Sequence, residues 1–197
     1  MRPAFTDILR RLREEEGGNV AIETMIFAPI FAGAFLALGT LWDAFSARTD
    51  SLRATYAIAD SLSRTYDEIT AAEIEELEDL FAFIARAQDP NDVAVRVSLV
   101  KRALDDDGES EHNELEWSYS TASSFPAHQT VADVQEIVPA MAVGEIVIVT
   151  ETFNPWAPAW GGSADSGTKL GIGDFDGWTF SEAVAMRPRF VGQVPFD

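Results

Sequence analysis

The first part of the chain contains one long run of apolar residues. All nineteen residues from Thr24 to Trp42 are uncharged, and most of them are apolar. As a helix that rises about 1.5 Å per residue, the segment from Val20 to Trp42 would be roughly 35 Å long, whereas the hydrocarbon core of a bilayer is about 30 Å thick. The pattern therefore predicts a helix that can span a membrane.

Beyond Trp42 the apolar pattern changes to one typical of an amphipathic helix. Apolar residues recur at intervals of three, four or seven, beside polar residues that would form an outer face. No Gly or Pro lies between Leu41 and Asp89, so nothing favours a break in the helix. We expect one long helix, with its first half in the membrane and its second half packed on a sheet through Phe45, Leu52, Tyr56, Ala59, Leu62 and Tyr66.

A second helix is predicted to begin after Thr70. The Thr70 hydroxyl can cap the first turn while Glu73 reaches back to form a capping box, and Ile69 and Ile74 have the spacing of a hydrophobic staple. Pro90 marks the expected end of this helix. Its buried face would consist of Ile74, Leu77, Phe81 and Ile84.

Strict alternation of apolar and polar residues predicts strands in the remainder of the chain. Residues 92–104 and 113–120 indicate an antiparallel pair, and residues 144–153 form the clearest strand. Residues 131–141 predict a short helix or turn, and residues 178–190 a last strand, with Pro188 at a sheet edge because it cannot donate a ladder hydrogen bond. The expected fold class is α+β, with two helices and a small antiparallel sheet.

The segment from Asn154 to Gly167 is predicted to be a long loop containing Trp156 and Trp160. These two side chains could stack on a sugar or contact a partner subunit. The more common outcome for loop aromatics is that they fold back onto the sheet, because they bury large areas. We retain Trp156 and Trp160 as a candidate interaction loop.

Charge narrows the classes of function. The chain carries 33 acids against 14 bases, for a net charge of -19. Residues 1–18 hold four Arg and four acids, so the acidity belongs to the later part of the chain. Such a chain lacks the basic surface that nucleic-acid binding requires.

Few residues are available for catalysis or for metal binding. The chain has no Cys and only two His, His112 and His128, and it contains no G-x-S-x-G, P-loop or G-x-G-x-x-G motif. We therefore predict no enzymatic activity, catalytic residue, metal site or cofactor. The carboxylates Asp105, Asp107 and Glu109 do not match an EF-hand, which favours a solvated hairpin tip over a calcium site.

The charges that flank the apolar run predict its orientation. Four Arg precede it, whereas two Arg, Arg48 and Arg53, lie in the twenty residues that follow. The positive-inside rule then places the N-terminus in the cytoplasm and exports the acidic body. A secretory signal has a shorter apolar region, about 7 to 15 residues. Signal cleavage after Ala34, giving a chain that starts at Phe35, remains an alternative.

Glu23 stands at the start of the apolar run, where an acid is unexpected. A buried acid costs about 2.5 to 3.5 kcal/mol at the centre of a membrane helix, and less near the surface. The helix could begin at Thr24, or Glu23 could favour the positive end of the helix dipole. Cleavage after Gly18 offers a third explanation, because the new amine of Asn19 would lie one helical turn from Glu23.

The stretch "GGNVAIETMIFAPIFAGAFLALG" resembles the N-terminus of the TadE/TadF-like minor pseudopilins of tight adherence (Tad, or Flp) pilus systems, which are related to type IV pilins. In that family a prepilin peptidase cuts after a Gly, a Glu is fifth in the mature chain, and a Pro often follows six residues later. Gly18, Glu23 and Pro29 occupy these positions. Thr24 replaces the Tyr-like residue of the major pilin, and "VPAMAVGEIVIVTETFNPW" with "AMRPR" extends the resemblance loosely toward the C-terminus.

The resemblance implies a pilin-like fold and three regions. Residues 1–18 would be a cytoplasmic prepilin-type leader, residues 19–42 a transmembrane helix and assembly stalk, and residues 43–197 an exported head. The implied location is the bacterial inner membrane, with a single pass. The implied partners are a prepilin peptidase, other minor pseudopilins and the major pilin, and Glu23 and Pro29 would serve assembly.

Two alternatives to this interpretation stay open. The chain could be a signal-anchored envelope protein whose head binds a ligand or glycan, or acts as an enzyme, by itself. It could also be an uncleaved relative of the same pseudopilins. The sequence leaves undecided whether the Gly18–Asn19 bond is cut and whether the protein is incorporated into the filament.

Overall fold

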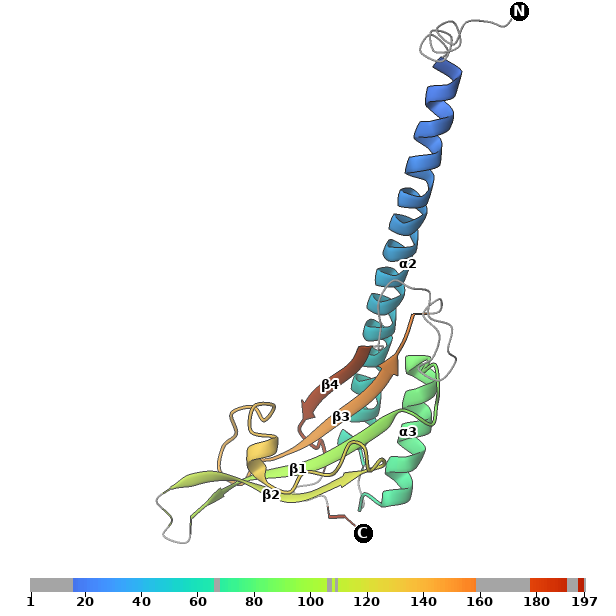
Figure 1. The fold of residues 1–197 in the computed structure, drawn as a ribbon. Helices are drawn as coiled ribbons and strands as arrows, with labels where there is room; N and C mark the ends of the chain where they lie inside the picture. Colours follow the sequence, from blue (N-terminus) through green and yellow to red (C-terminus); the bar gives the residue numbers. More distant parts are fainter. Residues whose placement is uncertain are drawn as a thin grey trace, which may run out of the picture. The chain divides into compact units, whose positions relative to one another are not determined.

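The computed structural model describes residues 16–65, 68–105, 108, 110–158, 178–190 and 195–196, without the side chains of residues 16–19 (Figure 1). The chain divides into two units, Met1–Asp43 and Ala44–Asp197, which are described separately below. The elements are helices α2 (Glu16–Ser63) and α3 (Ala71–Ala85), a 3-10 turn η1 (Val131–Asp133), and strands β1 (Ala94–Leu104), β2 (Glu111–Ser120), β3 (Ile146–Trp156) and β4 (Trp178–Met186). The predicted α+β class is confirmed.

The four strands form one antiparallel sheet in the order β2-β1-β3-β4. Val97 of β1 lies opposite Tyr119 of β2 on one side and Thr150 of β3 on the other. The predicted pairing of residues 92–104 with residues 113–120 is therefore confirmed. β1 and β3 are central, and their residues are buried on both faces over most of their length.

Helices α2 and α3 cover the same face of the sheet (Figure 1). Alternate residues of β1 and β3 point toward the helices and form the main core with them. Burying a large apolar side chain contributes about 1.5 to 3 kcal/mol, so this layer supplies most of the stability of the second unit. The core residues of the helices are Ala54, Ile58, Leu62, Ile74, Leu77, Phe81, Ala82 and Ala85, and those of the strands are Val95, Val97, Leu99, Ile146 and Ile148.

The buried face of α2 in the second unit differs from the predicted one. Ala59 and Leu62 are buried as expected, but Phe45, Leu52 and Tyr56 are exposed, and Tyr66 lies outside the described residues. The residues that contact the sheet side are mostly small, because small side chains allow a helix to approach a sheet closely. They are Ala44, Ser51, Ala54, Thr55, Ile58, Ala59, Leu62 and Ser63.

Polar contacts fix α2 on the sheet. The hydroxyls of Thr55 and Thr152 are 2.7 Å apart, and the Asn154 side-chain amide donates to the Ser51 hydroxyl at 2.7 Å. All four side chains are buried. Because most buried polar groups in folded proteins are hydrogen-bonded, these two contacts favour this position of α2 along β3.

Helix α3 begins as the sequence predicts. The Thr70 hydroxyl accepts a hydrogen bond from the Glu73 amide at 3.2 Å, which is the N-cap half of the expected capping box. The buried face is also as predicted, except that Ile84 is only partly buried. The helix ends at Ala85, before the expected stop at Pro90, because Arg86 adopts the left-handed conformation with φ 52°.

The face of the sheet opposite the helices carries a second, smaller apolar cluster. Val100, Val147 and Val149 of the strands pack here with Val134, which follows η1. The predicted short helix or turn at residues 131–141 is thus a single 3-10 turn followed by irregular chain that covers this part of the sheet.

Several strand boundaries differ from the predicted ones. β1 begins at Ala94, β2 at Glu111 and β3 at Ile146, where residues 92, 113 and 144 were expected. β3 continues through Pro155 to Trp156, so the expected loop after Phe153 begins later. Pairing of β3 with β1 ends at Phe153, so Pro155 has only β4 as a neighbour, and this position tolerates a residue without an amide donor. β4 is an edge strand as expected, but it ends at Met186, so Pro188 follows the strand and does not lie within it.

Candidate functional site

The apolar part of α2 in the first unit exposes almost all of its side chains. Met25 is 80% exposed and Trp42 is 78% exposed. No described residue buries the most apolar stretch of the helix. One helix of the described chain is long and apolar enough to cross a membrane, and it is this one. A surface this apolar is stable in lipid or against other helices rather than in water.

Glu23 and Pro29 both lie within this helix. Glu23 is exposed, and it is the only acid between Asn19 and Trp42. Pro29 lacks an amide hydrogen, so one backbone hydrogen bond of the helix is lost there. The sequence suggested specific assembly roles for both residues, and the structure shows their positions on the helix.

The Gly17–Gly18 pair belongs to the first turn of α2, which starts at Glu16. Each Gly in a helix interior is about 1 kcal/mol less favourable than Ala, and the first turn has few hydrogen bonds to lose. The turn that contains Gly18 and Asn19 is therefore the part of the helix that unwinds at the lowest cost.

Trp156 does not form an exposed binding platform. It is only 5% exposed, lies in strand β3, and packs against Trp178 and Phe180 of β4 with ring centroids 5.7 and 6.2 Å apart. Trp156 therefore lies in a strand and not in the expected loop, and its ring packs on the sheet, which is the more common outcome expected for these aromatics. Trp160 lies outside the described residues.

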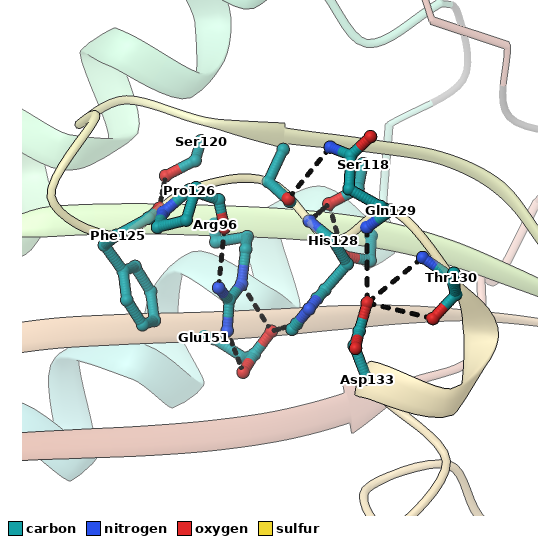
Figure 2. A network of polar contacts seen from close by, with 12 residues as sticks. Arg96, Ser118, Ser120, Phe125, Pro126, His128, Gln129, Thr130, Asp133 and Glu151 are labelled. Carbon is teal, nitrogen blue, oxygen red and sulfur yellow. Dashed lines mark hydrogen bonds and ion pairs between the residues drawn. The ribbon is translucent and has the colours of Figure 1, made fainter.

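A buried charged network lies on the sheet face opposite the helices (Figure 2). Arg96 of β1 and Glu151 of β3 are directly opposite in the register, and Arg96 donates to both carboxylate oxygens, from Nη2 at 2.7 Å and from Nε at 2.9 Å. His128 Nε2 is 2.6 Å from Glu151 Oε2. The three side chains are 8 to 10% exposed.

The chain between β2 and η1 covers this network. Arg96 Nη1 donates to the Pro126 carbonyl at 2.7 Å, and the guanidinium carbon lies 4.0 Å from the centre of the Phe125 ring. The His128 amide donates to the Ser118 hydroxyl at 3.0 Å. Figure 2 shows Arg96, Glu151 and His128 converging beneath this segment. The network thus holds an irregular segment onto the sheet.

The same segment is held at its far end by Asp133. The Asp133 carboxylate accepts hydrogen bonds from the amide and the hydroxyl of Thr130, both at 3.1 Å. These bonds, led by the one from the Thr130 amide, lower the pKa of Asp133 below its ordinary value. The segment is therefore fixed at both ends by charge-assisted hydrogen bonds.

The arrangement of the network indicates a structural role. Both oxygens of Glu151 accept hydrogen bonds from Arg96, and one of them also lies within hydrogen-bond distance of His128, so the three side chains bind one another. Sequence analysis missed the network because its members are far apart in the chain. The available signal was a charged residue within each of two apolar strands, Arg96 between Val95 and Val97, and Glu151 between Thr150 and Thr152.

The candidate acidic loop is closed by backbone hydrogen bonds, from the Asp105 amide to the Ser110 carbonyl at 2.8 Å and from the Gly108 amide to the Asp105 carbonyl at 2.7 Å. Asp105 Oδ1 also lies 2.8 Å from Nδ1 of His112, which is in strand β2. Asp107 and Glu109 lie outside the described residues. Among the residues that the structure describes, no group of three or more His, Asp or Glu has an arrangement that could hold a metal ion.

Comparison with known proteins finds no match to a family model, to a curated protein or to a solved structure.

Proposed function

We propose that this protein is a minor pseudopilin of a Tad-type pilus system, anchored in the bacterial inner membrane by residues 19–42 with its head exported. The observation that carries the proposal is a single acid, Glu23, five residues after a Gly pair in the otherwise uncharged and exposed apolar segment 19–42 of α2. A simple anchor requires neither the acid nor the Gly pair. In a pilin-like precursor, both have a purpose.

Cleavage after Gly18 would change the electrostatics of the helix start. The new Asn19 amine would be cationic. Asn19 and Glu23 are four residues apart, so the amine and the carboxylate would lie on the same helix face. In lipid or between packed helices an unpaired acid is unfavourable, so Glu23 would pair with this amine or with that of a neighbouring subunit. Helix packing of this kind is the proposed mode of assembly.

The head is proposed to act through contacts with other subunits rather than through catalysis. The buried network of Arg96, Glu151 and His128 is occupied internally, and Trp156 is part of the core. The alternative of an anchored glycan-binding protein relied on Trp156 and Trp160 as a platform. Burial of Trp156 removes half of that platform.

The proposal is tested by producing the full chain with and without a prepilin peptidase and measuring its mass. The peptidase should remove residues 1–18 from the wild type, and Gly18→Leu should block this. Gly33→Ala is a matched control, because an added Cβ at Gly33 meets nothing within 4 Å and the residue is outside the proposed site. A peptidase-independent mass, or equal processing of Gly18→Leu, would refute the proposal.

A further inference from the structure

The outer side of α2 in the second unit carries large apolar residues beside Arg residues. Phe45 is 66% exposed and Tyr56 51%, and Leu52 is exposed as well. The side chains of Arg48 and Arg53 are 62% and 74% exposed. Counted from Phe45, the other four residues stand at +3, +7, +8 and +11, which lie on one side of a helix, and we term the five the α2 outer stripe.

The outer side of α3 has the opposite charge. Phe83 is 81% exposed and Leu80 is exposed, beside the exposed acids Glu76 and Asp79. These four residues stand at i, i+3, i+4 and i+7, which is one face of a helix, and we term them the α3 outer stripe. Helix α3 has five acids and no base, so like charges repel one another along it.

The two stripes match in both chemistry and spacing. Each combines large apolar side chains with charges of one sign, and the signs are opposite. Exposed Phe and Leu residues on a helix are unfavourable in water and gain from contact with one another. Opposite charges between packed helices also fix which faces meet.

We propose that the α2 outer stripe of one copy of this chain docks on the α3 outer stripe of a second copy. Each copy has a net charge of -19, so most faces of two copies repel one another. The α2 outer stripe carries Arg residues, and its positive charge attracts the acidic helix α3 of a second copy. The contact lies within the head and does not depend on cleavage after Gly18. The cleavage experiment can therefore refute the proposed function without refuting this interface, and the cross-linking experiment can refute the interface without refuting the proposed function.

The Arg residues of the stripe have donors to spare. Arg48 contacts Glu182 through Nε at 3.1 Å, and Arg53 contacts Asp50 through one terminal nitrogen at 3.6 Å. A guanidinium has five N–H donors. Glu76 and Asp79 form no ion pair with a described residue. New pairs between copies can therefore form without breaking those inside one copy.

The interface is tested by cross-linking, since the chain has no Cys of its own. Full-length Leu52→Cys and Phe83→Cys chains with different tags are produced together, and their membranes are treated with a short bis-maleimide. A mixed dimer should form between Leu52→Cys and Phe83→Cys. The control pair combines Leu52→Cys with Leu104→Cys, an exposed position at the end of β1, and should give little product. Equal yields from both pairs would overturn the proposal.

Charge reversal supplies a second test that keeps the fold intact. Arg53→Glu in the Leu52→Cys chain should lower the yield of mixed dimer about fivefold. This factor corresponds to roughly 1 kcal/mol, the free energy that an exposed ion pair contributes. Asp79→Arg in the Phe83→Cys chain should restore it. A yield that is unchanged by Arg53→Glu, or that is not restored by the paired reversal, would contradict the proposed contact.

Discussion

Replacing Glu151 by Ala tests how the head is held together. The substitution leaves the Arg96 guanidinium, which is about one-tenth exposed, without its carboxylate. Breaking a buried ion pair by removing one partner costs about 3 to 5 kcal/mol, because the remaining charge is buried and uncompensated. With an m value of about 2 kcal/mol/M in urea, the unfolding midpoint of the head should fall by about 1.5 to 2.5 M.

The assay is urea unfolding of the full chain in a mild detergent, with Trp fluorescence as the signal that reports unfolding. Glu114→Ala, at an exposed position of β2, should shift the midpoint little. The pair Arg96→Met with Glu151→Met should recover most of the lost stability, since apolar residues often replace a buried ion pair without loss. A loss below about 1 kcal/mol for Glu151→Ala would refute the structural role of the network.

Three further substitutions test other parts of the account. Burial raises the pKa of Glu78, so its charged form is disfavoured in the folded state. Glu78→Gln should therefore raise the urea midpoint at neutral pH, and the gain should vanish below the ordinary value of 4.5. Thr70→Ala should lower the stability of the head by about 1 kcal/mol in the same assay, and Thr70→Ser should retain most of it. Glu23→Gln should leave cleavage intact yet reduce pilus number in electron micrographs, unlike Asp43→Asn; unchanged piliation would remove the proposed role of Glu23.

Periodicity in the sequence predicts the elements whose residues repeat along one face. Helix α3 follows this rule, with Ile74, Leu77 and Phe81 buried beside exposed acids, and so does β2, in which the partly buried Leu115 and Trp117 alternate with the exposed Glu114 and Glu116. Thr70 gave the start of α3, because capping is a local interaction that depends only on nearby residues. These features are encoded within short windows of sequence.

Features that depend on distant contacts could not be predicted in this way. The face of α2 that packs on the sheet consists largely of Ala, Ser and Thr, so a search for large apolar residues selected Phe45, Leu52 and Tyr56, which are exposed. Arg96 and Glu151 are adjacent only because β1 and β3 pair in one register. Register between strands far apart in sequence is set by the whole sheet, and no local pattern shows it.

The central claim is tested most directly by the first residue of the mature protein. The full chain is extracted from the membranes of its native cells, and its N-terminal peptide is sequenced by mass spectrometry. We predict that the mature chain begins at Asn19. A chain that begins at Met1, or at Phe35 as after conventional signal cleavage, would contradict the account.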